Sequence, residues 1–346
     1  MQKVDYIIVG GGYAGIFFAH QLLTAGKSFK LFAGGAQGAS HVSAGVVNPV
    51  VLKKFTTFWL AQEQINCLKM TITEMESYTG KQFHIDEPVC RIFHDDNEKK
   101  LWEKKQATDA LSPFLSLEFT KLDVVNNEYG IGTVLQSGRL DVQSFFSSLS
   151  EFLNENGNLK HEIFDYKLLD AGSSVYMNLE YSKIIFCEGM GVLKNPFFCQ
   201  LPVQANKGHH LKVKLSSELN ISATLKKKHF LFSLRDGNYY YGGTYDRHQL
   251  DEGINPSAVE ELESGLKQMY PHEYLTTEIN YGFRPTVGDR RPILGAHETY
   301  KNMYVFNGLG ARGILNGSYF AKVLFQHTES GSPLPAEVDL KRFTVR

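Results

Sequence analysis

The stretch that decides the fold is Val4-Asp5-Tyr6-Ile7-Ile8-Val9, followed at once by Gly10-Gly11-Gly12-Tyr13-Ala14-Gly15. The first run is short and rich in β-branched residues, as is typical of a buried parallel strand. Apolar residues then recur at helical spacing over 16–23, and Gly26 ends the pattern. A second strand is expected at 29–32. This order of strand, glycine turn, helix and strand predicts the first βαβ unit of a Rossmann-type domain.

The glycines of this turn have distinct physical roles. Gly10 permits the tight turn, Gly12 lets the backbone approach a pyrophosphate, and Gly15 lets the helix and strand pack closely. The start of the helix then offers unpaired N–H groups and a partial positive charge to an anion. Between Tyr6 and Gln62 there are four lysines and no acidic residue, which also suits an anion.

One element of the motif is missing. An acidic residue is expected about 20 residues beyond the glycines, where it hydrogen-bonds the adenosine ribose. That place falls near Ala33, and no acidic residue lies close by. We therefore expect backbone, water or another side chain to bind the ribose, with Gln37 and Ser40 as candidates.

The composition is that of an ordinary globular protein. The 346 residues carry a formal net charge of −1, with 42% hydrophobic and 21% charged residues, which allows one large or two interleaved domains. The near-zero charge argues against a general nucleic-acid binder but is compatible with a local basic patch. The uncharged segment 6–26 contains five glycines and lacks a basic leader, so it is predicted to be neither a membrane span nor a signal peptide.

The four cysteines indicate the redox state of the protein, and the hydrophobic pattern predicts its remaining helices and strands. Cys67, Cys90, Cys187 and Cys199 show no CxxC pair or metal-ligand spacing, so we expect reduced thiols, no metal and a cytoplasmic location. Helices are expected over 57–78, 95–109, 139–154, 257–269 and 314–327. Strands are expected over 84–93, 161–169, 175–179, 183–189 and 303–307. Residues 203–244 are mostly extended, with a turn at 235–238.

This pattern predicts an α/β protein in which two domains are interleaved in the sequence. A Rossmann-type nucleotide-binding domain would comprise residues 1–80, 138–200 and 282–346. A β-sheet-rich substrate domain would comprise residues 81–137 and 201–281.

Five blocks in this order resemble the D-amino acid oxidase and glycine oxidase family of FAD-dependent oxidoreductases, over nearly the whole chain. The blocks are Gly10–Gly15, Ser40–Pro49, Ile184–Gly189, Gly282–Gly295 and Phe306–Gly313. The last two are the most specific. The run from Phe232 to Gly237, continuing to Gly242–Tyr245, resembles the strands that carry substrate-domain residues over the flavin. Members with a covalent flavin use Cys or His at defined positions. Here Phe283-Arg284 lies near one of them and His41 lies one residue from another, so we expect noncovalent FAD.

The resemblance implies a cofactor site spread over several segments. Its glycine turn would hold the FAD pyrophosphate, its second block would follow the pyrophosphate and flavin edge, and its last block would lie under the flavin pyrimidine ring. Phe164 matches the position whose backbone meets adenine, and Gly189 would lie near the cofactor. The residues of the glycine turn are Gly10, Gly12, Tyr13, Ala14 and Gly15. Those of the second block are Ser40, His41, Ala44, Gly45 and Val46. Those of the last block are Gly308, Gly310, Ala311, Arg312 and Gly313.

Residues for catalysis follow from the same resemblance. Arg284 matches the position that binds a substrate carboxylate, a task suited to a planar guanidinium that donates two parallel hydrogen bonds; a structural ion pair is the alternative. Arg312, just before a predicted helix, would favour an anionic reduced flavin; a solvated surface arginine is the alternative. Tyr241 and Tyr245 would close the pocket or hydrogen-bond the substrate, unless they pack in the core.

Three functions are consistent with these residues. The leading one is oxidation of the C–N bond of a small amine or amino acid (glycine, D-amino acid or N-alkyl amino acid) by hydride transfer to flavin, with oxygen or a quinone as acceptor. The second is the oxidase half of a bifunctional tRNA-modifying enzyme acting on a carboxymethylaminomethyl base, although the chain shows no methyltransferase domain and no marked basic tract. The third is a flavin-binding protein without redox turnover, favoured by the missing acid near Ala33. The oligomeric state stays open.

Overall fold

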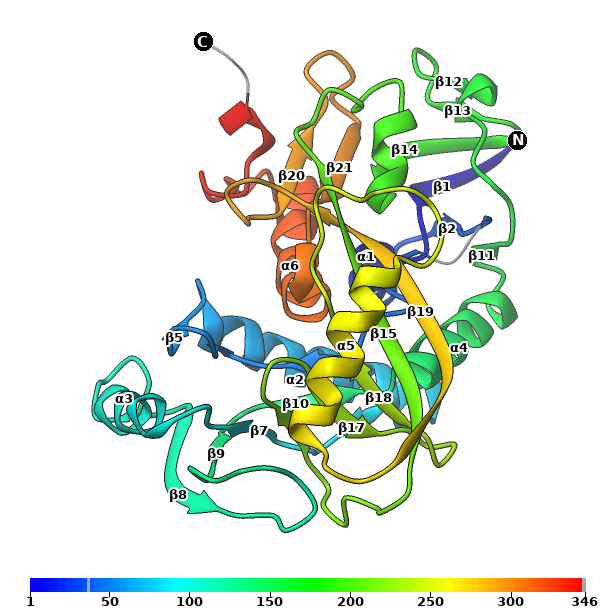
Figure 1. Cartoon of the computed structure of the whole chain (residues 1–346). Coiled ribbons are helices and arrows are strands. Elements are labelled where there is room, and N and C mark those ends of the chain that lie inside the picture. Colours follow the sequence, from blue (N-terminus) through cyan, green and yellow to red (C-terminus); the bar gives the residue numbers. More distant parts are fainter. Residues whose placement is uncertain (36–37, 344–346) are drawn as a thin grey trace.

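The computed structural model describes residues 1–35 and 38–343 and contains two eight-stranded sheets. Two long antiparallel strands, β15 (Gln204–Leu215) and β19 (Tyr274–Thr286), run between the two halves of the molecule (Figure 1). Residues from the second sheet are therefore carried to the edge of the first.

The first sheet is built around parallel strands in the order β11–β2–β1–β14, with β21 parallel to β14 on the other side. Successive residues of its central strand, Ile7 and Ile8, are both 0% exposed and belong to different apolar clusters. The sheet is therefore buried on both faces, as the continuous apolar run predicts. Its strands are β1 (Gln2–Val9), β2 (Phe29–Phe32), β11 (Leu159–Lys160), β12 (Leu169–Asp170), β13 (Val175–Tyr176), β14 (Leu179–Phe186), β20 (Ile293–Ala296) and β21 (Met303–Asn307).

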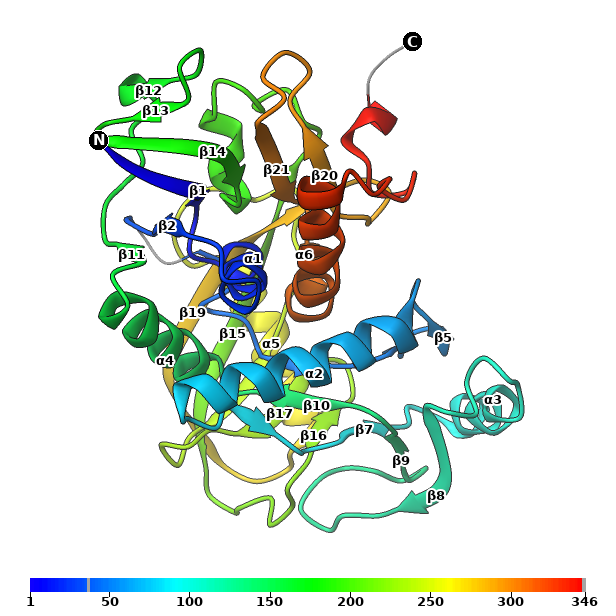
Figure 2. The same cartoon turned by 180° about the vertical axis from the view of Figure 1, so that it is seen from behind.

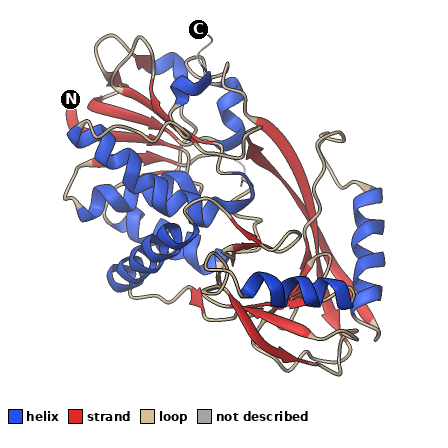
Figure 3. Ribbon diagram, turned by 90° about the vertical axis from the view of Figure 1, so that its left-hand side faces the viewer, coloured by secondary structure: helices blue, strands red, loops and turns tan. Residues whose placement is uncertain are grey.

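Helices cover one face of this sheet (Figure 3). The helices α1 (Tyr13–Thr24) and α6 (Gly313–Ser330) pack against each other there, and α2 (Ala61–Thr79) lies between them and the second half of the molecule (Figure 2). Further helices are α3 (Asp96–Gln106) and α4 (Val142–Glu155), with short 3-10 turns η1 (Tyr166–Leu168), η2 (Gly189–Lys194), η3 (Gly310–Arg312) and η4 (Leu340–Phe343).

The second sheet has the order β19–β15–β18–β17–β16–β7–β9–β8. One face packs against α5 (Pro256–Met269), whose Leu262 and Leu266 are buried beside Leu211 of β15. The remaining strands are β7 (Val89–Ile92), β8 (Leu115–Thr120), β9 (Ile131–Val134), β16 (Thr224–Lys226), β17 (Phe230–Ser233) and β18 (Tyr239–Gly242). Two small sheets connect the halves: β3 (Val46–Val47), β10 (Gly138–Leu140) and β6 (His84–Ile85), and β4 (Val50–Val51) with β5 (Thr56–Thr57).

The α/β class, the first βαβ unit and the turn between β17 and β18 are confirmed. Three expected elements differ most. The helix expected from Arg139 starts at Val142, because Gly138–Leu140 pairs in β10. The expected strand over 161–169 is mostly loop and the 3-10 turn η1: the Asp165 carboxylate caps this turn by accepting from the Lys167 amide, and the Phe164 and Tyr166 rings pack against Tyr176 of β13 and Phe186 of β14. The long helix starts at Ala61, not near residue 57, because Thr57 pairs in β5. The expected domain boundary at residue 282 falls inside β19.

None of the helices within residues 1–35 and 38–343 has the length and apolar character needed to cross a membrane.

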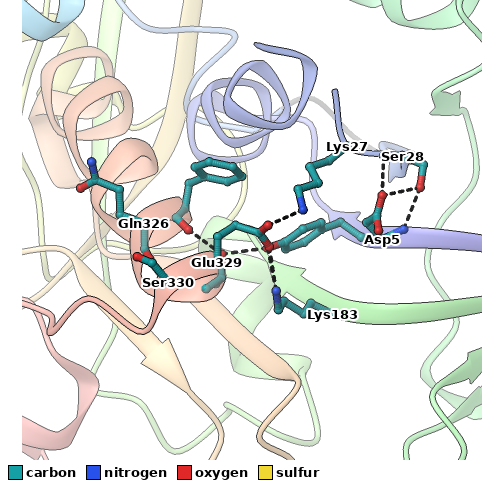
Figure 4. Close-up of polar contacts among 10 residues, drawn as sticks. Asp5, Lys27, Ser28, Lys183, Gln326, Glu329 and Ser330 are labelled. Atoms are coloured by element: carbon teal, nitrogen blue, oxygen red, sulfur yellow. Dashed lines mark hydrogen bonds and ion pairs between the residues drawn. The ribbon is translucent and has the colours of Figure 1, made fainter. Parts of the chain in front are cut away.

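The end of α6 is tied through Glu329 to β1, to β14 and to the connection between α1 and β2 (Figure 4). Its carboxylate forms ion pairs with Lys27, at 2.5 Å, and Lys183 of β14, at 2.7 Å, and accepts a hydrogen bond from the Tyr6 hydroxyl of β1 at 2.5 Å. Burial by itself raises the pKa of Glu329, but these three hydrogen bonds outweigh it and lower the pKa to about 2. The charged form therefore stabilises the fold.

Replacing Glu329 by Gln should lower the free energy of unfolding at pH 7 by about 1–3 kcal/mol, the usual range for hydrogen bonds to a charged group. Because the folded-state pKa lies below the ordinary value of 4.5, this contribution is complete above about pH 4.5 and disappears as the pH falls toward 2. Urea unfolding of both proteins at pH 7 and pH 3 measures the difference. Glu180→Gln, which breaks an exposed pair with Lys3, is the control and should change little; an equal loss in both variants would contradict the prediction.

Candidate active site

The blocks singled out in the sequence meet at the carboxyl end of the first sheet, where glycines allow the closest contacts. A Cβ added to Gly10 would lie 2.4 Å from the carbonyl oxygen of Cys187, which follows β14. A Cβ on Gly15 would lie 1.9 Å from the carbonyl oxygen of Gly10 itself. The turn, α1 and β14 are therefore in contact at distances that only glycine permits.

The later blocks join the same place. A Cβ on Gly313, at the start of α6, would lie 2.8 Å from the Tyr13 ring. One on Gly282 of β19 would lie 2.6 Å from Val42. The side chain of Asn307 closes the group, because it donates to the Gly189 carbonyl at 2.9 Å and accepts from the Gly308 amide at 2.7 Å.

The start of α1 offers free hydrogen-bond donors. The Ser40 hydroxyl accepts from the Tyr13 amide at 3.2 Å, whereas the amides of Gly12, Ala14 and Gly15 have no acceptor in the part of the chain that the structure describes. The first turn carries no acidic residue. Unpaired amides at a helix start, next to a glycine turn, fit the diphosphate of FAD.

At the end of β2, no described residue replaces the acidic side chain that would bind the adenosine ribose. A Cβ on Gly11 would lie 2.7 Å from that of Ala33, so this strand end is closely packed. Of the two candidates for the ribose, Ser40 caps α1 and Gln37 lies outside the described residues. Glu188, directly after β14, is an acidic residue that the sequence did not single out for the ribose. Its carboxylate accepts hydrogen bonds from the Tyr166 hydroxyl and the Asn195 amide.

Two of the predicted cofactor residues, Phe164 and Tyr13, have buried side chains. The ring of Phe164 is 7% exposed and stacks on Tyr176 at 4.1 Å between centroids. Tyr13 is 3% exposed, and its hydroxyl contacts Ser43 at 2.8 Å. Their side chains belong to the apolar cores, which leaves their peptide groups for a ligand.

The second block, Ser40–Pro49, comes after β2 and contains β3. The His41 ring stacks on Phe146 of α4 at 4.1 Å, and burial lowers its pKa. Gly45 has φ +69° and contacts the backbone at Leu140, where a Cβ would lie 2.1 Å from the carbonyl oxygen. Ala44 precedes it half buried, and Val46 pairs in β3.

The last block forms η3 and the start of α6. Gly308 and Gly310 have positive φ, at +71° and +59°, and Ala311 is exposed. The Arg312 guanidinium lies 4.7 Å from the centroid of the Phe58 ring. Burial, with a smaller effect of two neighbouring arginines, lowers the pKa of Arg312. This cation sits at the N-terminus of α6, as the sequence predicted.

Arg284 lies on β19 on the face of the second sheet that meets this edge. Its Nη1 donates to Asn206 Oδ1 and to the Thr244 carbonyl, each at 3.0 Å. The exposed Tyr245 ring contacts the guanidinium, with 4.4 Å from Cζ to the ring centroid. No carboxylate pairs with Arg284 among the described residues, so it is not a structural ion pair there.

The expectation that Tyr241 closes the pocket is wrong, because neighbouring residues of a strand point to opposite faces. Tyr241 is buried against α5, where a Cβ on Gly265 would lie 2.8 Å from its hydroxyl. Tyr240 faces Arg284 instead: a Cβ on Gly243 would lie 3.1 Å from Arg284 Nη2 and 3.5 Å from the Tyr240 hydroxyl. Burial raises the pKa of Tyr240, so its hydroxyl stays protonated.

The two neighbouring histidines also face opposite ways. His209 is buried on the far side, where its Nε2 accepts from the Asn255 amide at 3.0 Å. His210 stacks on Tyr240 at 4.5 Å, and burial, aided by the charge of Arg284, lowers its pKa to about 4. His210 is therefore neutral at physiological pH.

The described residues contain no group of three or more His, Cys, Asp or Glu that could hold a metal ion.

Comparison with known proteins gives one family. A family model described as DAO, FAD dependent oxidoreductase, matches residues 5–327. The curated tRNA 5-methylaminomethyl-2-thiouridine biosynthesis bifunctional protein MnmC of Leptospira borgpetersenii serovar Hardjo-bovis is 22% identical over 96% of this chain, which spans 58% of that protein's length. Glycine oxidase of Bacillus licheniformis is 22% identical, over 91% of this chain and 90% of its own.

A solved structure has the same fold throughout. Glycine oxidase from Geobacillus kaustophilus aligns with a TM-score of 0.80 and 17% identity, covering 100% of this chain and 99% of that one. The whole architecture is therefore shared, including the long strands that join the two sheets.

Replacing Gly10 by Ala should weaken FAD binding at least about tenfold, because its φ of +110° disfavours a side chain and the Cβ would overlap the Cys187 carbonyl. Gly26→Ala is the matched control: Gly26 lies between α1 and β2 of the same βαβ unit, with φ +65°, but has nothing within 4 Å of the added Cβ. Fluorescence titration of the apoproteins with FAD measures both affinities. Equal affinities in the two variants would contradict this role of Gly10.

Proposed function

The chain belongs to the DAO family of FAD-dependent oxidoreductases, and from that premise we propose that it oxidises the C–N bond of a small amine bearing a carboxylate. The substrate is of the glycine, D-amino acid or N-alkyl amino acid type, and oxygen or a quinone reoxidises the cofactor. One observation carries the proposal: the half-buried Arg284 has no carboxylate partner among the described residues, although its Nη1 is fully engaged.

The remaining donors suit a carboxylate. Arg284 Nη2 and the Tyr240 hydroxyl approach the same point beside Gly243, and neither has a hydrogen-bond acceptor in the described part of the chain. A guanidinium and a phenol can together donate to both oxygens of one carboxylate. Such charged hydrogen bonds contribute about 1.5–3 kcal/mol each. The pair thus fixes the orientation of the substrate.

Bound FAD supplies the redox chemistry by accepting a hydride from the carbon next to the amine nitrogen. The chain must keep that amine neutral, because an ammonium has no electron pair to support hydride loss. Arg284 and Arg312 both place positive charge near the site and disfavour an ammonium there. His210, neutral at physiological pH, adds no further positive charge.

Replacing Arg284 by Leu should leave FAD bound and lower kcat/KM for a carboxylate-bearing amine at least about a hundredfold, since the substrate carboxylate loses its charged partner. Anaerobic flavin bleaching by glycine, sarcosine and D- and L-amino acids identifies the substrate first, and steady-state kinetics then compare the proteins. Arg247→Leu, at an exposed position, is the control. Unchanged kcat/KM in the Arg284 variant would remove it from the site, and wild-type protein that no amine bleaches would favour a redox-inactive flavoprotein.

A second candidate function is oxidation of a carboxymethylaminomethyl group on a tRNA base. It is supported by a set of arginine–aromatic contacts near the site: Arg291 lies over Trp59 at 4.5 Å and Arg312 over Phe58 at 4.7 Å. Neither arginine, nor the exposed Arg290, has a carboxylate within ion-pair distance among the described residues. Basic groups interleaved with aromatic rings are typical of surfaces that bind single-stranded RNA.

The two candidates differ in their response to salt. If tRNA is the substrate, its affinity should fall steeply between 50 and 200 mM salt, and exchanging both Arg290 and Arg291 for Ala should reduce the salt slope by about two. Fluorescence anisotropy with labelled tRNA measures the slope. Absence of tRNA binding at low salt, with free amino acids bleaching the flavin, would reject this candidate.

A further inference from the structure

Asn206 is the residue directly opposite Arg284 in the pairing of β15 and β19. Its side chain is 5% exposed, and its Oδ1 accepts from Arg284 Nη1 at 3.0 Å. An arginine has donors only, so the amide oxygen must face the guanidinium and the amide nitrogen must point away. The buried Asn206 amide thus has a fixed orientation and accepts a hydrogen bond from the Arg284 guanidinium.

The second acceptor for Nη1 is equally immobile. The Thr244 carbonyl accepts at 3.0 Å, and Thr244 is itself held by β15: its amide donates to the His209 carbonyl at 3.1 Å, and its hydroxyl accepts from the His209 amide at 2.9 Å. The two hydrogens of Nη1 therefore go to two acceptors anchored on one strand. This fixes the plane of the guanidinium as well as its position.

Gly208 makes room for that position. It lies two residues beyond Asn206 on the same face of β15, and a Cβ there would lie 2.3–2.6 Å from the guanidinium. The Nε and Nη2 atoms have no acceptor within the described residues. The edge left free is thus Nε–Nη2, which can donate two parallel hydrogen bonds.

We propose that Asn206 is the positioning residue of the carboxylate site: it holds Nη1 so that the Nε–Nη2 edge of Arg284 faces the substrate. This inference rests on the proposed function. A neutral amide is the suitable partner because it orients the guanidinium without cancelling its charge, whereas a carboxylate would compete with the substrate for the same cation. Asn206 therefore sets the preference for carboxylate-bearing amines without touching them.

The test uses FAD-loaded protein, with acetate as a probe followed by its effect on flavin absorbance. Asn206→Leu keeps the branched shape and removes the acceptor, and should weaken acetate binding about tenfold. Asn206→Asp restores an acceptor but adds a charge, and should weaken acetate binding by at least as much. In both variants, KM for a carboxylate-bearing substrate should rise by the same factor, while KM for an amine without a carboxylate stays unchanged.

Asn255→Leu is the matched control, since it removes another buried Asn that has no contact with Arg284. It should lose comparable stability and keep wild-type acetate affinity. Arg284→Leu separates the two hypotheses. If it binds acetate as wild type does, the proposed function fails; if it loses acetate but Asn206→Leu or Asn206→Asp keeps it, only the role of Asn206 is overturned.

Discussion

The close approach of β1, α1 and β14 at the carboxyl edge of the first sheet is the constraint on which the rest depends. Gly10 and Gly15 leave no space for even a methyl group between these elements. α1 starts directly at the strand end, and the amides of Gly12, Ala14 and Gly15 have no acceptor among the described residues, whereas that of Tyr13 donates to Ser40. The other blocks, from Ser40 to Gly313, then pack around this edge. The oxygens of a diphosphate are suitable acceptors for these unpaired amides.

The strands β15 and β19 join this edge to the second sheet. They pair along nearly their full length, so a residue on β19 has a fixed partner on β15. Asn206, Gly208 and His210 therefore share one face with Arg284, and alternate residues such as His209 and Leu211 pack into the opposite core. This geometry explains why a flexible side chain such as arginine is held in one orientation: both of its acceptors belong to a paired strand or to a loop bonded to it.

Sequence alone could predict what depends on local pattern. The glycine turn, the first βαβ unit and Arg284 within its block are each recognisable from neighbouring residues. Tyr240 and Tyr241 could not be told apart, because both lie in one aromatic run and only the register of β18 decides which face each meets. Asn206 and Asn307 carried no local signal. Their roles come from partners 78 and 118 residues away, Arg284 and Gly189.

The arginines show why the overall composition conceals the site. Arg91, Arg139, Arg235 and Arg342 each pair with a carboxylate. Arg284 and Arg312 have no such partner among the described residues, although both are half buried. The net charge of −1 does not distinguish arginines that pair with a carboxylate from those that do not. Partial burial of a guanidinium costs free energy that neutral hydrogen-bond acceptors and aromatic rings offset in part and a bound anion offsets further. The positive charge left unpaired at the meeting point of the two sheets therefore favours an anionic ligand, which is why we propose that a substrate carboxylate binds there.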